Sequence, residues 1–90
     1  MSQTFDIAHL NVEGIDCLVV AADATSKTDS ARNQLLAQLT RYARNAGLKV
    51  DKAALAFEEF GTIKYYGTRD LVEWLANNWL PSWNRTLTCP

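Results

Sequence analysis

Residues 28–47 constrain the fold most, because their pattern fits an amphipathic helix. Apolar residues recur there at the spacing that stacks side chains on one side of a 3.6-residue helix, namely Leu35, Leu39, Tyr42 and Ala46. Thr28, Asp29 and Ser30 are N-cap candidates, since their side-chain oxygens can accept from the first free backbone N–H groups. Gly47 predicts a left-handed C-terminal stop. Such a helix has to pack on an apolar surface, which the flanking segments must supply.

The chain of 90 residues has the size of one small domain, and 48% of its residues are hydrophobic, which is enough for a core. Its net charge of −1 conceals an asymmetry. Residues 1–26 carry four acids and no lysine or arginine, whereas residues 27–52 carry six bases against two acids. An acidic segment beside a basic helix can be self-complementary, or it can form a dipolar surface that steers a partner.

No stretch approaches the roughly 18 apolar residues of a membrane span, and the first ten residues lack the pattern of a signal peptide. We therefore expect a cytoplasmic protein that does not contact a membrane. Cys17 and Cys89 make neither a metal-binding spacing nor a disulfide framework. Cys17 is expected to be a small core residue and Cys89 an exposed tail thiol. The sequence predicts no metal and no cofactor.

Residues 5–22 are expected to form two strands around a turn at Asn11-Val12-Glu13-Gly14. Asparagine at the first position and glycine at the fourth are typical of a type I turn followed by a left-handed glycine, which gives a three-residue hairpin loop with a bulge. This register places His9 opposite Cys17 on the apolar face that is expected to meet the helix.

Residues 51–61 contain good helix formers and could form a two-turn helix. However, Glu58-Glu59-Phe60-Gly61 repeats the turn of the first hairpin, and residues 63–66 favour a strand. The preferred interpretation is a second hairpin over residues 53–66, with Phe57 opposite Ile63. It predicts that Leu55 and Phe57 are buried, that Glu58 is exposed, and that Tyr66 lies on the outer face of the sheet.

A second helix is expected to begin after Gly67, with Thr68 as its N-cap, and to end at about Leu80 because of Pro81. Its apolar arc consists of Leu71, Val72, Trp74, Leu75 and Trp79. Residues 82–90 lack helical periodicity, so we expect a single domain over residues 1–81 and a C-terminal tail over residues 82–90. The predicted fold is α+β with the order ββαββα, a four-stranded antiparallel sheet with two helices packed on one face.

His9 and Cys17 are the one nucleophile–base pair that the sequence offers, and a register change of one residue would place them on opposite faces. No third residue that could orient the pair is evident. The sequence also contains no glycine-rich phosphate loop and no metal-ligand cluster. We therefore expect no enzymatic activity and no catalytic residues.

Three tryptophans within ten residues are the most unusual feature of the C-terminal part. Trp79 and Trp83 are expected to form an exposed or semi-exposed patch that contacts an unidentified protein partner or a second copy in a homodimer. A second candidate surface is the basic side of the first helix, with Arg41 and Arg44 for phosphates and Tyr66 to stack bases. The sequence thus predicts a non-catalytic protein-binding module of the accessory or inhibitor type, which acts through surface complementarity. A nucleic-acid-binding domain is the less favoured alternative, because the net charge is not basic.

Overall fold

The computed structural model describes residues 3–89 and contains a five-stranded sheet with two helices. The elements are β1 (Gln3–Val12), β2 (Ile15–Ala21), α1 (Asp29–Asn45), β3 (Lys52–Glu59), β4 (Thr62–Gly67), α2 (Arg69–Asn78) and β5 (Arg85–Cys89). The strand order is β4-β3-β2-β1-β5, and neighbours are antiparallel except β2 and β3, which are parallel. The α+β class is confirmed, but the sheet is mixed and has five strands instead of the expected four antiparallel strands.

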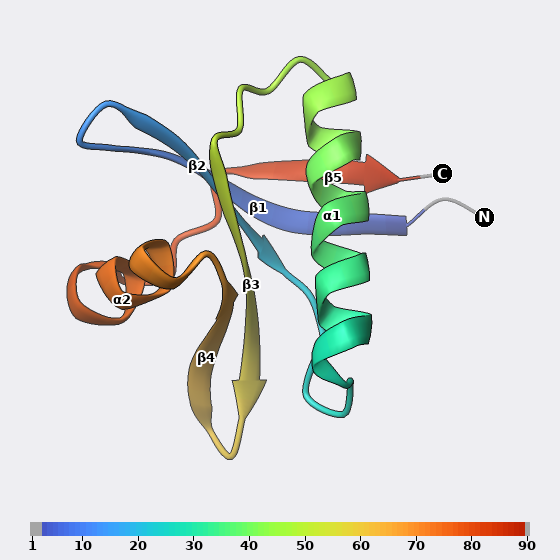
Figure 1. Ribbon diagram of the computed structural model, residues 1–90, viewed down its shortest axis with the longest axis vertical. Helices are drawn as coiled ribbons and strands as arrows, with labels where there is room; N and C mark the ends of the chain where they lie inside the picture. Colours follow the sequence, from blue (N-terminus) through green and yellow to red (C-terminus); the bar gives the residue numbers. More distant parts are fainter. Residues whose placement is uncertain (1–2, 90) are drawn as a thin grey trace.

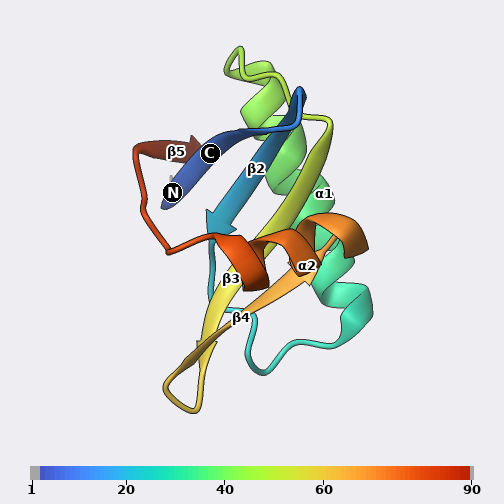
Figure 2. The ribbon, with the colours of Figure 1, turned by 90° about the vertical axis from the view of Figure 1, so that its left-hand side faces the viewer.

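The two helices cover opposite faces of the sheet, so the expectation that they share one face is wrong (Figures 1 and 2). Leu39 and Ala43 of α1 pack on one face, the α1 face, whereas Leu71 and Leu75 of α2 pack on the other, the α2 face. The central strands explain this arrangement. Residues 17–20 of β2 and 53–57 of β3 are buried at every position, so both faces of the sheet are apolar and each needs a cover.

Helix α1 begins and ends as the sequence predicts. Thr28 is the N-cap, and its Oγ1 accepts from the backbone N–H of Ala31 at 3.2 Å. Gly47 has a φ of 93°, and the N–H of Leu48 donates to the carbonyl oxygen of Ala43 at 3.0 Å, as in a Schellman stop. The helix is the crossover that connects the parallel strands β2 and β3.

Both hairpins close with two-residue loops and not with the three-residue bulged loops that we expected. Glu13-Gly14 has φ values of 53° and 83°, and Phe60-Gly61 has values of 53° and 75°. Positive φ at both positions is the requirement of a type I′ turn, whose twist matches that of the flanking strands. As a result, Val12 pairs with Ile15 in the first hairpin.

The shorter loop changes the register by one residue and moves side chains to the opposite face. His9 pairs with Leu18 and Cys17 pairs with Leu10, so His9 and Cys17 are not neighbours. In the second hairpin Phe57 pairs with Lys64 and not with Ile63.

Residues 52–59 form a strand, which excludes the alternative helix over residues 51–61. Leu55 is fully buried and Phe57 is 7% exposed, whereas Glu58 is exposed, as the hairpin interpretation predicted.

The turn at Phe60 leads to a prediction about stability. A bulky side chain at a φ of 53° is unfavourable, whereas asparagine is a preferred first residue of a type I′ turn. Phe60 is 96% exposed, so its replacement removes no packing. Phe60→Asn should therefore raise the free energy of unfolding by about 1 kcal/mol in urea denaturation. A loss of stability would show that the Phe60 ring makes contacts within the fold.

The segment after α2 returns to the sheet. Thr68 is the N-cap residue of α2, although its side chain makes no capping hydrogen bond, and the helix ends at Asn78, ahead of Pro81. Strand β5 then pairs with β1, so most of the expected tail belongs to the sheet. The thiol of Cys89, expected to be exposed, is buried on the α1 face with only 5% of the residue exposed. Pro90, the last residue of that expected tail, lies outside the described residues.

Candidate functional site

Three aromatic rings come together on the α2 face near the end of α2. The ring centroid of Trp79 lies 6.1 Å from that of Tyr65 and 5.4 Å from that of Trp83, the latter pair being edge-to-face. All three side chains are partly buried and pack against the core below α2. Burial raises the pKa of the Tyr65 hydroxyl. Aromatic pairs of this geometry contribute about 0.5–1.5 kcal/mol beyond their buried area, so the cluster fixes the link between α2 and β5 over the sheet.

Two large exposed apolar side chains, Ile63 and Leu80, lie next to this cluster, and a third, Phe60, lies at the tip of the β3–β4 hairpin. Phe60 is 96% exposed, Leu80 is 85% exposed and Ile63 is 39% exposed. Leu80 follows Trp79 in the chain, and Ile63 lies on the same face of β4 as Tyr65. We call the group around the Trp79–Trp83 pair the aromatic surface, and it consists of Ile63, Tyr65, Trp79, Leu80 and Trp83. The sequence pattern identified the two tryptophans but not Ile63 or Leu80.

An open hollow lies beside the aromatic surface, at the carboxyl ends of the parallel strands β2 and β3. It is lined by small and apolar residues of the strand ends, by Ile63 and Trp83, and by polar residues of the loop after β2, in full Ala21, Ala22, Asp23, Thr25, Ser26, Ala56, Phe57, Glu58, Ile63 and Trp83. In open α/β sheets, ligands bind outside the carboxyl ends of the parallel strands. The hollow has the corresponding position at β2 and β3, the one parallel pair among the described strands.

Hydrogen bonds fix the loop that forms one wall of the hollow. Thr25 Oγ1 donates to the carbonyl oxygen of Glu58 at 3.0 Å, and the Thr25 N–H donates to the carboxylate of Asp23 at 3.3 Å. From α1, Arg32 Nε donates to the carbonyl oxygen of Ala24 at 2.9 Å. Arg32 thus has a structural role and is not a free cation on the basic side of the helix.

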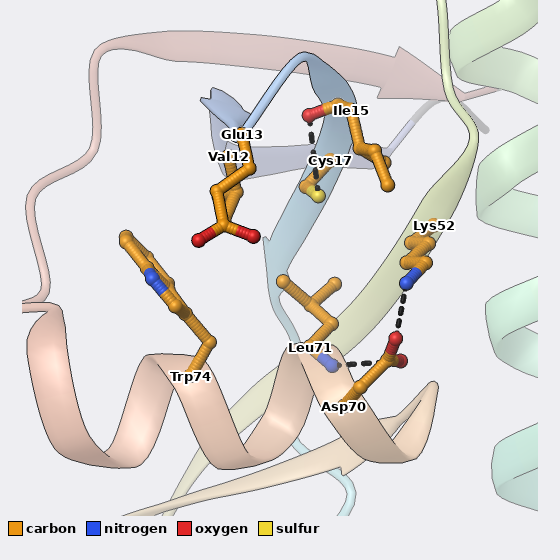
Figure 3. Close-up of a pocket in the computed structure, with 8 residues that line it drawn as sticks. All are labelled: Val12, Glu13, Ile15, Cys17, Lys52, Asp70, Leu71 and Trp74. Carbon is orange, nitrogen blue, oxygen red and sulfur yellow. Dashed lines mark hydrogen bonds and ion pairs between the residues drawn. The ribbon is translucent and has the colours of Figure 1, made fainter.

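A second hollow, of about 120 Å³, lies between α2 and the first hairpin (Figure 3). It is lined by Val12, Glu13, Ile15, Cys17, Lys52, Asp70, Leu71 and Trp74. The ammonium group of Lys52 pairs with the carboxylate of Asp70, and Cys17 Sγ donates to the carbonyl oxygen of Ile15 at 3.6 Å. The Lys52–Asp70 contact raises the pKa of Lys52 and lowers that of Asp70, so both groups are charged at neutral pH.

The thiol in this hollow favours its protonated form. Burial raises the pKa of Cys17 and outweighs the opposite effect of Lys52, and a protonated thiol is a poor nucleophile. No histidine assists it, because His9 lies on the other face and its Nε2 donates to the carbonyl oxygen of Lys49 at 2.8 Å. The His9–Cys17 pair considered from the sequence is therefore not assembled.

This arrangement predicts that Cys17 is protected from alkylation. Cys17 is 1% exposed, and burial raises its pKa. At pH 8, iodoacetamide should modify Cys17 at least about tenfold more slowly in the folded chain than in urea, because reaction requires opening of the structure. Peptide mass spectrometry measures both rates. Rapid and stoichiometric modification of Cys17 in the folded chain would instead indicate an activated thiolate.

The residues of the alternative nucleic-acid site do not form one surface. Arg41 and Arg44 are both exposed on α1, and Arg44 Nη2 donates to the carbonyl oxygen of Val50 at 2.8 Å. Tyr66 lies on the α1 face, not on the outer face that we expected, and its hydroxyl donates to Asn33 Oδ1 at 2.8 Å. Asn33 precedes Arg41 by two turns of α1, or about 12 Å along the axis. Tyr66 is thus unavailable to stack a base beside these cations.

The chain was compared with models of protein families, with curated proteins and with solved structures, and none of them matched. Within residues 3–89, no group of three or more His, Cys, Asp and Glu side chains could hold a metal ion. Neither helix of this part of the chain is long and apolar enough to cross a bilayer. The functional proposal therefore depends on the aromatic surface and on the hollow beside it.

Proposed function

We propose that this chain is a small protein-binding module that acts without catalysis, through the aromatic surface. One observation carries the proposal: of the three large hydrophobic side chains that are exposed in residues 3–89, two, Ile63 and Leu80, lie next to the aromatic rings of Tyr65, Trp79 and Trp83 along the strand or the chain. Contiguous apolar patches with polar rims mark interaction sites, and tryptophan and tyrosine are enriched among the residues that dominate binding energies. The polar rim is supplied here by the loop after β2.

The conformation of Phe60 supports the same proposal. Its φ of 53° is unfavourable for a bulky residue, and its ring is exposed at the tip of the β3–β4 hairpin. The type I′ turn accounts for the positive φ, but no packing within the described fold covers the exposed ring. Strained residues of this kind occur preferentially at functional sites, and burial of the ring against a partner would offset the exposure. Phe60→Asn is therefore expected to weaken partner binding while it stabilises the free chain.

The direct test of the proposal is Leu80→Asp. Leu80 is 85% exposed, so a carboxylate at this position should leave the thermal melt of the chain unchanged. Within an apolar interface, however, the charge would be desolvated, and binding should weaken by about 2 kcal/mol or more, which is roughly 30-fold in Kd.

The measurement compares proteins captured by the immobilised wild-type chain, by the variant and by a control variant, from a lysate of the cells that encode it, with and without nuclease. Gln34→Asp is the matched control. Gln34 is also exposed to solvent, but it lies on α1 and therefore away from the aromatic surface. A partner lost with Leu80→Asp and kept with Gln34→Asp supports the proposal. Partners kept equally by all three chains, or captured only without nuclease, contradict it.

A further inference from the structure

We propose that the hollow beside Trp83 receives a lysine or arginine side chain of the partner protein. The proposal rests on the proposed function and specifies the partner as a protein with an exposed basic segment. It is derived from the lining of the hollow, which combines a floor of small residues, two apolar walls and two carboxylates.

The apolar part of the hollow fits the aliphatic stem of such a side chain. Ala21, Ala22 and Ala56 leave room above the ends of the central strands, and Ile63 and Trp83 form the walls. Lysine and arginine bury their methylene groups along surfaces of this type while the charged head remains at the polar edge. A cation near the face of an indole ring is further attracted by the ring quadrupole, and Trp83 provides that ring.

The polar part of the hollow supplies negative charge. Asp23 and Glu58 are exposed, and in the part of the chain that the structure describes neither carboxylate takes part in an ion pair. Thr25 positions the Asp23 carboxylate, to which it donates its N–H at 3.3 Å, and its hydroxyl ties the loop to the backbone of β3 by donating to the Glu58 carbonyl oxygen at 3.0 Å. A preorganised site loses less entropy on binding, and a hydrogen bond between two charged groups is stronger than a neutral one.

A second copy of the chain fits this surface less well than a different protein. A two-fold axis through the hollow would bring the Asp23 and Glu58 carboxylates of two copies to one interface, where like charges repel.

The test uses a phage-displayed library of random twelve-residue peptides selected on the immobilised full chain. Enriched peptides should contain lysine or arginine next to apolar residues. Their affinities are then measured by fluorescence anisotropy for the wild-type chain, for the double variant Asp23→Asn/Glu58→Gln, for Leu80→Asp and for Glu13→Gln. The double variant retains a side-chain oxygen at position 23 that can accept from the Thr25 N–H. Glu13→Gln is the control, because Glu13 is an exposed carboxylate in the turn between β1 and β2.

We expect the double variant to bind at least tenfold more weakly, Glu13→Gln to bind as wild type, and peptides with the basic residue changed to glutamine to lose the same factor. Enriched peptides without a basic residue, or equal binding to the double variant, overturn the inference.

Leu80→Asp separates this inference from the proposed function. If the peptides that overturn the inference still bind Leu80→Asp more weakly than wild type, the proposed function stands. If no peptide prefers wild type over Leu80→Asp, both proposals fail. A wild-type dimer in sedimentation that is abolished by Leu80→Asp assigns the surface to a second copy and overturns the inference.

Discussion

Gly67→Ala should lower the free energy of unfolding by about 3 kcal/mol, because there is no space for a methyl group where β4 ends. A Cβ at this position would lie 2.4 Å from the carbonyl oxygen of Ala53 and 2.7 Å from Cα of Ala54. Both are backbone atoms of β3, which is held between β4 and β2, so they cannot move away without disturbing the sheet. The sequence interpretation treated Gly67 only as the start of a helix and missed this close approach.

Gly47→Ala is the matched control, since a Cβ there would have no atom within 4 Å. Its φ of 93° makes alanine unfavourable by about 1 kcal/mol, without a steric clash. Urea denaturation of the two variants separates the effects. A Gly67→Ala variant as stable as Gly47→Ala would contradict the close packing of β4 on β3.

Arg32→Ala should have the next largest effect, a loss of about 2–3 kcal/mol of unfolding free energy. The Arg32 side chain is 17% exposed, and its guanidinium carbon lies 4.8 Å from the ring centroid of Phe57 and 5.5 Å from that of Tyr66. It also donates to the carbonyl oxygens of Ala24 at 2.9 Å and Thr25 at 3.4 Å. Truncation would remove the Arg32 donor from both carbonyl oxygens, leaving that of Ala24 with only the N–H of Lys27 at 3.3 Å, and would uncover the two rings.

Arg32→Lys should not restore stability, because an ammonium group can neither stack on both rings nor reach both carbonyl groups. Arg41→Ala is the control on the same helix, and since Arg41 is exposed we expect a change within about 0.5 kcal/mol. Chemical denaturation of the three variants measures the differences. Equal stabilities of Arg32→Ala and Arg41→Ala would show that Arg32 does not hold the loop.

The local elements were predictable because their signals are local. Capping residues and apolar spacing define α1, and Thr28 and Gly47 act as predicted. The hairpin register was not predictable, because the type I′ turns contain Glu13 and Phe60 at positions where asparagine, aspartate or glycine is preferred. With those residues the pattern favoured a type I turn and a three-residue loop, and an error of one residue reverses the faces of a strand.

The sequence contained a signal for one helix on each face of the sheet, and we misinterpreted it. Cys-Leu-Val-Val in β2 and Ala-Ala-Leu-Ala-Phe in β3 are continuous apolar runs, typical of strands covered on both faces. Two strands covered on both faces require one helix on each side of the sheet. They also permit β2 and β3 to pair in parallel, with α1 as the connection between them. Strand β5 also had a signal, because buried Leu87 and Cys89 alternate with exposed Thr86 and Thr88.

Half of the candidate site could be located from the sequence. Trp79 and Trp83 stand out by residue type and spacing, and the structure pairs their rings. The hollow could not be located, because Asp23 and Glu58 are far apart in the chain. They line one hollow only because β2 and β3 are parallel neighbours whose carboxyl ends lie at the same edge of the sheet.

Site-specific photocrosslinking in the cells that encode this protein tests the central claim most directly. The photoreactive residue p-benzoylphenylalanine replaces Leu80 in one chain and Gln34 in another, and both positions are exposed. The account predicts that irradiation links the chain carrying the label at position 80 to a discrete protein, and that the label at position 34 gives no such product. Crosslinking of the same protein from both positions, or from position 34 alone, would contradict the claim that the aromatic surface binds the partner.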